Sequence, residues 1–373
     1  MAVAEMELKS QELEAIEKLK NTYTAMREEL AKRIVGQEAV LDQLITSLFS
    51  GGHCLLVGVP GLAKTLMIRS LAELMNLSFN RIQFTPDLMP SDITGAEVLT
   101  EEKGKSDRSF KFLSGPIFAN VVLADEINRT PPKTQAALME AMEEHQVTVA
   151  GKEYQLDFPF FVLATQNPIE QEGTYPLPAA QLDRFMFMVY VDYPDESEEY
   201  DILRLTTTRY QAKLEQLLSK EEIVDLIQIV RKVRIPDHVL DYATKLARFT
   251  RPTNPDAPAF IREWLSWGAG PRSAQALILG AKARSMLYGR FDVSYEDIHA
   301  IVHPVMRHRI IPNFHAEAEG IAADDVIDML LDFLPYPGMP VKQVKKTSFW
   351  SKFFKSIFGF GQNGRDTYRK YLK

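Results

Sequence analysis

The sequence has little cysteine and no long apolar run. Cys54 is the single cysteine among 373 residues, so a disulfide within the chain is excluded. No apolar stretch approaches the roughly 20 residues of a membrane-spanning helix. Residues 1–5 lack the basic segment and apolar core of a secretory signal, and we expect a cytoplasmic protein. His53, beside Cys54, could be read as a metal ligand, but nothing pairs with it, and we interpret it as the start of a strand.

Positive charge is scarce outside the C-terminal segment. The chain carries a formal net charge of −7, yet residues 342–373 alone carry +8, which leaves −15 for the rest. Proteins that bind nucleic acid without sequence preference need a basic face to neutralise phosphates. An acidic body therefore makes nucleic acid an unlikely partner.

A phosphate-binding loop is the clearest motif that is present. It lies between the apolar run 54–57 and an apolar, helix-like run 66–72. The order of strand, glycine-containing loop and helix suits a nucleoside triphosphate, because backbone N–H groups at a helix N-terminus bind anions. Lys64 is expected to reach the β- and γ-phosphates of ATP, and the Thr65 hydroxyl to ligate Mg²⁺. The expected nucleotide-binding set is Gly58, Pro60, Gly61, Leu62, Ala63, Lys64, Thr65 and Leu66.

Ala63 departs from the usual pattern, which has glycine before the Lys-Thr pair. Alanine fits a tight turn there if its φ is negative. The structural alternative for the whole segment is a plain strand–turn–helix junction.

An acidic pair provides the expected partner of this loop. Asp125 and Glu126 follow the apolar run 121–124, at the carboxyl end of a predicted buried strand, where parallel sheets bind ligands. Asp125 is expected to hold Mg²⁺, largely through water, and Glu126 to polarise the attacking water. The alternative is a solvated acidic turn after a core strand.

A second apolar run, 160–165, predicts another buried strand and is followed by Asn167. Asn167 could hydrogen-bond the γ-phosphate or orient the attacking water. It could also simply initiate a turn before Pro168.

These motifs together resemble the MoxR family of AAA+ ATPases. The resemblance covers about residues 30–335, and it is carried by the runs 124–135, 174–178 and 181–185. Members of this family usually carry alanine before the loop lysine, which accounts for Ala63. Ala180 is a small departure, because the family usually has glutamate there.

The resemblance implies further roles. Val35 and Gly36 correspond to the turn that contacts adenine, and Asn167 to the sensor-1 asparagine. Arg184 corresponds to an arginine finger that reaches a neighbouring subunit's γ-phosphate, and Arg272 to the sensor-2 arginine of the lid. Arg184 could instead cap the preceding helix, and Arg272 could pair with a surface acid.

The resemblance also implies a homo-oligomeric ring, expected to be a hexamer, that remodels protein clients containing a von Willebrand factor A domain. Two other functions stay open at this point. One is a nucleotide-gated scaffold in which binding rather than turnover matters. The other is a magnesium-chelatase-like subunit or DNA-associated motor.

Four segments follow from the pattern of the chain. Residues 1–30 are expected to form a helix, and 31–194 an α/β AAA+ core with a parallel five-stranded sheet. Residues 195–335 are expected to form a smaller all-α lid, and 336–373 a basic aromatic tail. Two β-hairpin insertions are predicted in the core, over 96–113 and 147–158, where the family has its helix-2 and pre-sensor-1 insertions.

The tail contains an amphipathic stretch, 349–360. At about 100° per residue its aromatic side chains share one half of a helical wheel, and its lysines and serines share the other. Such a helix could bind the inner face of a membrane peripherally. It could also dock on this subunit, a neighbour or another protein.

Overall fold

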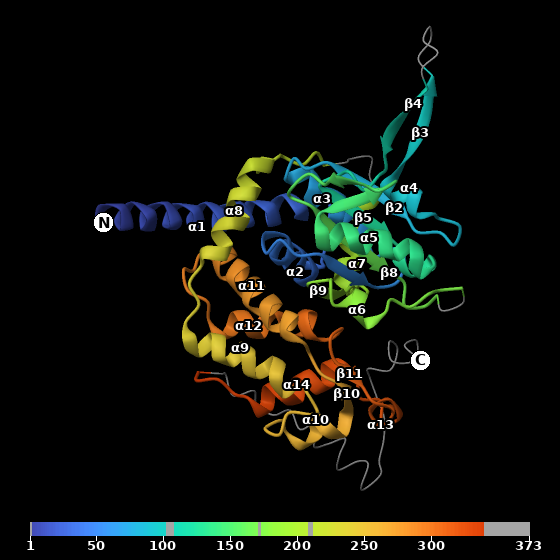
Figure 1. Cartoon of the computed structure of the whole chain (residues 1–373). Coiled ribbons are helices and arrows are strands. Elements are labelled where there is room, and N and C mark those ends of the chain that lie inside the picture. The colour runs from blue at the N-terminus through green and yellow to red at the C-terminus, as the bar shows by residue number, and fades with distance from the viewer. Residues whose placement is uncertain (1, 102–107, 171–172, 208–211, 339–373) are drawn as a thin grey trace.

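The computed structural model describes residues 2–101, 108–170, 173–207 and 212–338. An α/β core carries the sheet, and a helical lid lies below it in Figure 1. The basic segment 342–373 and its amphipathic stretch lie outside the described residues. No helix in the described ranges combines the length and the apolar content that a bilayer crossing requires.

The core is built on five parallel strands. Their order across the sheet is β2 (Phe79–Gln83), β5 (Val121–Asp125), β8 (Phe161–Gln166), β1 (Cys54–Val57) and β9 (Phe187–Tyr190). Every neighbouring pair runs parallel. The prediction of a parallel five-stranded sheet is therefore confirmed.

Strands β1, β5 and β8 are buried on both faces, which explains why they are nearly continuous apolar runs, whereas the edge strand β2 is only partly buried. Side chains alternate between the faces. Cys54 and Leu56 join the larger apolar core, together with α2 (Glu38–Phe49) and α3 (Lys64–Leu74). Leu55 and the other alternate positions join a second core, which α5 (Pro132–Glu144) covers.

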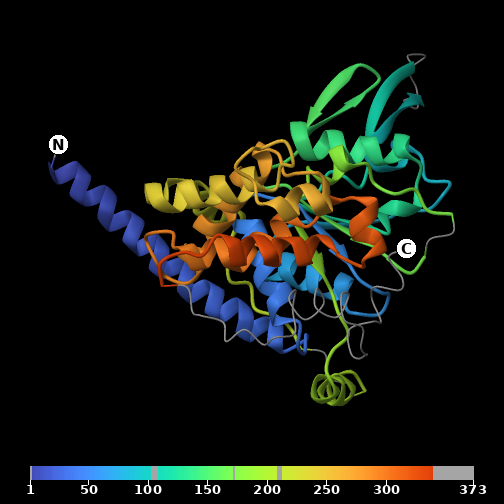
Figure 2. The same cartoon turned by 90° about the horizontal axis from the view of Figure 1, so that it is seen from below.

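Two β-hairpins interrupt the core, as predicted. Their strands are β3 (Gly95–Glu101) with β4 (Arg108–Ser114) and β6 (Gln146–Val149) with β7 (Lys152–Gln155), and α4 (Pro90–Thr94) leads into the first. The hairpins lie side by side in Figure 2. Phe112 stacks on Tyr154 with the ring centroids 3.9 Å apart, so the two insertions form one projecting unit.

The N-terminal helix α1 (Ala2–Ala31) extends to the left in Figure 1. Its second half is packed: Leu19, Met26 and Leu30 are fully buried. This half contacts α3, α8 (Lys220–Lys232) and the lid. The helix therefore belongs to the folded body of its own subunit.

The lid follows α7 (Glu196–Thr206), a helix without buried residues that stands away from the body at the bottom of Figure 2. It is helical except for one short antiparallel pair of strands. Its elements after α8 are α9 (Asp237–Phe249), α10 (Ala259–Trp264), β10 (Leu265–Trp267), α11 (Pro271–Leu287), α12 (Tyr295–Met306), β11 (Ile311–Pro312), α13 (Phe314–Ala318) and α14 (Ala323–Phe333).

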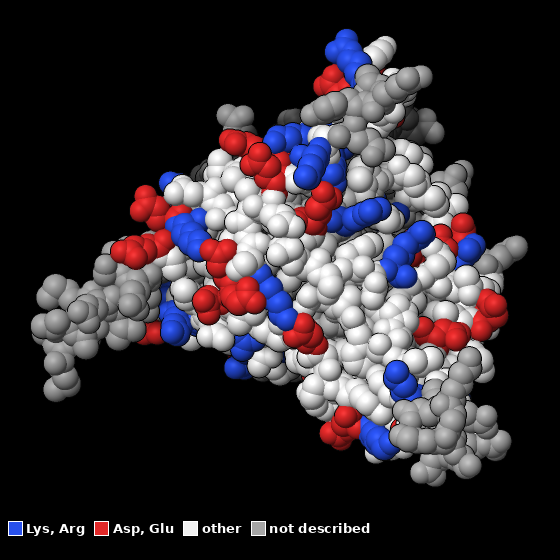
Figure 3. Space-filling model, turned by 90° about the horizontal axis from the view of Figure 1, so that it is seen from above, with Lys and Arg blue, Asp and Glu red and all other residues white. Residues whose placement is uncertain are grey.

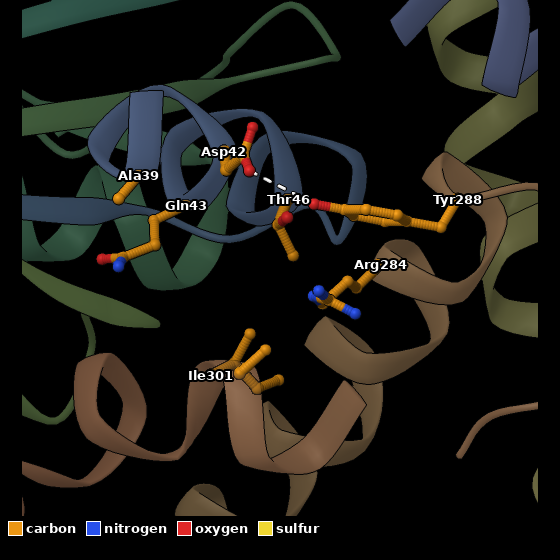
Figure 4. A pocket seen from close by; sticks show the side chains of 8 residues that line it. Ala39, Asp42, Gln43, Thr46, Arg284, Tyr288 and Ile301 are labelled. Atoms are coloured by element: carbon orange, nitrogen blue, oxygen red, sulfur yellow. Dashed lines mark hydrogen bonds between the residues drawn. The ribbon is translucent and has the colours of Figure 1, made fainter. Parts of the chain in front are cut away.

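Core and lid meet where α2 faces α11 and α12. A cavity of about 130 Å³ lies at this junction (Figure 4). The hydroxyl of Tyr288, directly after α11, points to α2 and donates a hydrogen bond to Asp42 Oδ2 at 3.2 Å. Tyr23 of α1 donates to the other oxygen of the same carboxylate. One acid of α2 thus links the N-terminal helix and the lid.

Candidate active site

The phosphate loop leads from β1 into α3, which begins at Lys64. The Lys64 ammonium donates to the carbonyl oxygens of Gly58 at 2.6 Å and Val59 at 2.7 Å. Burial lowers the pKa of Lys64, while the carboxylates of Asp125 and Glu126 act in the opposite direction. A cation therefore sits inside the turn, opposite the two acids.

Several residues of the loop are exposed, although Gly58 and Val59 are buried. Pro60, Gly61 and Ala63 are exposed, Leu66 is largely exposed, and Leu62 and Thr65 are half-buried. Exposed backbone N–H groups at the start of a helix suit an anionic phosphate chain.

Ala63 has φ 56°, so the expected negative φ is wrong. A non-glycine residue in the left-handed region costs roughly 1–2 kcal/mol. The strain is tolerated because Ala63 is the N-cap of α3 and turns the chain into that helix. Gln37 and Glu126 also have positive φ, at 58° and 57°. Backbone strain of this kind concentrates at functional sites.

Asp125 and Glu126 lie at the carboxyl end of β5. The Thr165 hydroxyl of β8 donates to Asp125 Oδ1 at 2.5 Å and accepts from the Glu126 backbone N–H at 2.9 Å. Arg81 of β2 pairs with the other oxygen of Asp125, Nη2 to Oδ2, at 2.6 Å. Both neighbouring strands therefore fix the orientation of this carboxylate.

Glu126 is held separately. Its Oε2 accepts from Gln83 Nε2 at 3.1 Å and lies 3.0 Å from Arg129 Nη1. The side chain of Asp125 instead contacts Thr165 and Arg81. The two adjacent acids thus face different partners and can serve different purposes.

Asn167 follows β8 and is buried. Its Oδ1 accepts from the Ile169 N–H at 3.1 Å, which is the turn-initiating contact considered for this residue. The sheet register also brings it towards the loop, because Gln166 pairs with Val57 and β8 lies between β5 and β1. Loop, acids and Asn167 therefore meet at the carboxyl edge.

The turn at Val35 and Gly36 lies beside the segment that leaves β9. Gly36 has φ 66°, and the Glu198 carboxylate of α7 lies against the place that a side chain would take. Gln37 donates to the Asp192 carbonyl at 2.7 Å. The predicted adenine turn is thus joined to the start of α7.

Arg184 and Arg272 do not join this group. Both pair with Glu143 at the end of α5, and Arg184 Nη1 also donates to the Ala180 carbonyl at 2.9 Å. The preceding carbonyl, of Met142, bonds with His53 just before β1. The arginines therefore lie at the amino edge of the sheet, across β1 from the phosphate loop.

The residues of the carboxyl edge fit a magnesium–nucleotide pair. Thr65 and Asp125 offer the oxygen ligands that Mg²⁺ prefers. Among the described residues, no group of three or more His, Cys, Asp or Glu side chains could hold a metal by itself. Magnesium bound with nucleotide typically takes few protein ligands and completes its shell with phosphates and water.

Comparison with known proteins supports this arrangement. Residues 53–187 match the model of the ATPase family associated with various cellular activities (AAA), and residues 260–330 match an AAA lid domain. The chain is 38% identical to the chaperone MoxR1 of Mycobacterium tuberculosis, over 83% of this chain and 81% of that protein. It belongs to the MoxR family of AAA+ ATPases.

Two other relatives agree. The uncharacterized protein YeaC of Bacillus subtilis is 40% identical over 83% of this chain and 93% of its own length. A crystal structure of a proposed ATPase from Cytophaga hutchinsonii superposes with a TM-score of 0.81 at 41% identity. The alignment covers 88% of this chain and 99% of that one. The MoxR resemblance and the fold predicted from it are confirmed.

Several polar residues at the two edges of the sheet were not predicted from the sequence. They are Arg81, Gln83, Arg129, Glu143 and Thr165. One signal was present for Thr165, which is a polar residue at the end of an apolar strand beside the strand of Asp125. The others carry no local signal, because their partners come from distant segments.

Proposed function

We propose that this chain is an ATPase that works as a ring of copies of itself, expected to be a hexamer, and remodels protein clients. The observation that carries the proposal is the meeting of the Lys64 loop, Asp125, Glu126 and Asn167 at one sheet edge. In parallel sheets this is the edge where ligands bind.

Each residue then has a separate role. Lys64 and the loop backbone bind the phosphates, and Thr65 and Asp125 hold the metal. The Glu126 side chain contacts Gln83 and Arg129, and not the residues that hold Asp125. Glu126 is therefore assigned to polarise the attacking water. Asn167 orients that water or contacts the γ-phosphate. Magnesium, when bound, neutralises charge on the phosphates.

Assembly completes the site. Arg184 lies at the amino edge of its own sheet, and β1 spans roughly 13 Å at the usual rise per residue. Its guanidinium therefore serves the pocket of a neighbouring copy, where it stabilises charge on the transferred phosphoryl group. The hexameric ring itself is taken from the AAA+ resemblance.

The projecting hairpins supply a surface for clients. Leu99 and Phe110 stand directly opposite each other in β3 and β4 and are 50% and 70% exposed. Exposed apolar side chains of this size mark binding surfaces. We propose a client with a von Willebrand factor A domain, and the name chaperone given to MoxR1 supports a protein client.

Nucleic acid fits the charge pattern of the face in Figure 3 poorly. On the face seen in Figure 3, Lys and Arg are interspersed with Asp and Glu and form no basic stripe. This favours a protein client over a DNA-associated motor. We further propose a cytoplasmic location, with the tail as the segment that docks on protein or on the inner membrane face.

The proposal is tested with Glu126→Gln. This variant is expected to bind ATP with Mg²⁺ normally but to release phosphate about 10²- to 10⁴-fold more slowly, the usual value of a positioned general base. Glu144→Gln, at an exposed site on α5, is the control. Phosphate release by the assembled variant at the wild-type rate refutes the role of Glu126. Absence of turnover in the wild type refutes the ATPase function.

A client is sought with the same variant. Held with ATP, Glu126→Gln is expected to retain a partner that Lys64→Ala does not, because only the former binds nucleotide. Recovery of a von Willebrand factor A domain protein supports the client class. Equal recovery with both variants contradicts a nucleotide-dependent interaction.

A further inference from the structure

Glu143 links two arginines that come from different parts of the chain. Its Oε2 accepts from Arg184 Nε at 2.8 Å and from Nη2 at 2.5 Å. Its Oε1 accepts from Arg272 Nη2 at 2.6 Å. One carboxylate of the core thus binds the guanidinium after α6 (Ala179–Leu182) and the guanidinium in the first turn of α11.

The electrostatics of this trio favour an ionised Glu143. The guanidinium groups of Arg272 and Arg184 both hold the pKa of Glu143 below its ordinary value. Asp183 Oδ2 also lies 3.9 Å from Arg272 Nη1, but Glu143 is the carboxylate that pairs closely with both guanidinium groups. Glu143 therefore keeps two guanidinium groups close together that would otherwise repel.

The lid is fixed to the core beside this trio. Arg309 of the lid, buried, donates from Nε to Asp183 Oδ1 at 2.7 Å and from Nη2 to the Phe185 carbonyl at 2.7 Å. His308 bonds with the same carbonyl at 2.9 Å. The lid is thus anchored to both chain neighbours of Arg184, whereas the guanidinium groups of Arg184 and Arg272 are linked through Glu143.

The trio is accessible to a phosphate from outside the subunit. The side chains of Arg184, Glu143 and Arg272 are 27%, 33% and 47% exposed. Their own phosphate loop is at the other edge of the sheet. A multiply charged triphosphate of a neighbouring copy can therefore meet both guanidinium groups together, and charge-assisted bonds from arginine are strong.

The geometry points to Glu143 as a positioning residue for phosphoryl transfer: it holds Arg184 and Arg272 side by side for the nucleotide of the adjacent copy. This inference rests on the proposed ATPase function. Glu143 acts through the two arginines and touches no substrate itself. Its loss should therefore lower kcat while ATP binding to its own pocket is unchanged.

The test uses the full chain with Glu143→Ala and the isosteric Glu143→Gln. Both are expected to lower kcat about tenfold and to leave the Kd of a fluorescent ATP analogue within twofold of wild type. Glu144→Gln, the adjacent acid, is the control and should match wild type in both measurements. A wild-type or raised kcat for Glu143→Gln overturns the inference, because the carboxylate is then dispensable or restrains the arginines.

A mixing experiment separates positioning in the neighbour's site from a merely structural role. Glu143→Ala is mixed with Lys64→Ala, which has a defective pocket but an intact trio. In mixed assemblies each Glu143→Ala pocket beside a Lys64→Ala copy regains a positioned arginine pair. Activity should then exceed the sum of the two proteins measured apart.

Two results of the mixing overturn the inference. One is an activity equal to that sum although co-purification through a tag shows mixed assemblies. The other is failure of both Glu143 variants to enter assemblies while their thermal midpoints match wild type, which makes Glu143 an assembly contact. Failure of the proposed function is distinct, because the wild type then shows no turnover at all.

Discussion

The two edges of the sheet differ in how their polar residues are held. At the carboxyl edge, Lys64 begins a helix, Asp125 ends a strand and Asn167 directly follows one. At the amino edge, Arg184 and Arg272 are held through Glu143, which is 129 residues from Arg272. The first group is made by local chain geometry and the second by packing of the lid on the core.

This difference suggests separate roles for the two edges of the sheet. We propose that the carboxyl edge binds nucleotide within one subunit, through the loop, the acids and their partners. The amino edge offers positive charge and no phosphate loop. In a ring, the amino edge of one copy would complete the carboxyl edge of the next.

The largest effect is expected from a substitution at the amino edge. Arg184→Ala should reduce the rate of ATP hydrolysis by about a thousandfold or more, the usual value of an arginine finger, and leave ATP binding unchanged. Arg204→Ala, which removes an exposed arginine of α7, is the control. The measurement is steady-state phosphate release beside nucleotide binding. Undiminished turnover by Arg184→Ala would show that the amino edge takes no part in ATP hydrolysis.

A smaller effect tests the carboxyl edge. Thr165→Val removes the hydroxyl that bonds with Asp125 and with the Glu126 N–H, and leaves both groups poorly oriented. Loss of such a bond costs about 1–2 kcal/mol, so kcat should fall about tenfold. Thr165→Ser, which keeps the hydroxyl, should retain most of the rate. Equal rates for the two variants would contradict the orienting role.

The last expected effect concerns the stability of the amino edge in acid rather than the rate of ATP hydrolysis. Burial, despite the bond with the Met142 carbonyl, lowers the pKa of His53 to about 4 from 6.5, with a further decrease from nearby His145. The folded state keeps His53 neutral, whereas the unfolded chain protonates it below pH 6.5. Stability should therefore fall as pH decreases from 6.5 to 4, by about 3 kcal/mol from this group at the limit.

This dependence is measured by urea unfolding at several pH values. His53→Gln should be less stable at neutral pH but should lose less stability between pH 6.5 and 4 than the wild type. His308, whose pKa burial also lowers, contributes in the same direction and leaves a residual slope. A slope identical to that of the wild type would show that His53 is not the titrating group.

The sequence predicts the carboxyl edge of the sheet better than the amino edge. The Lys64 loop and the Asp125–Glu126 pair are contiguous with apolar strands, so their place at the carboxyl edge was predictable. The two hairpins were predictable from their polar turns. The left-handed backbone of Ala63 was not predictable, because it depends on how the loop enters α3.

The amino edge was hidden for a physical reason. The bond from Arg309 to Asp183 joins residues 126 apart, and Arg184 reaches Glu143 over 41 residues. No period or motif encodes such contacts. The structural alternatives for Arg184 and Arg272, a helix cap and an acid partner, are both present, yet only the fold shows that the two arginines share the same acid.

The central claim, that ATP is hydrolysed between copies of the chain, is tested most directly by mixing Lys64→Ala with Arg184→Ala. Each protein alone should be nearly inactive, the first because its pocket fails and the second because it lends no guanidinium. In mixed assemblies, an intact pocket of Arg184→Ala meets the intact Arg184 of Lys64→Ala, and hydrolysis should return. If mixed assemblies form and remain as inactive as the separate proteins, the claim is wrong.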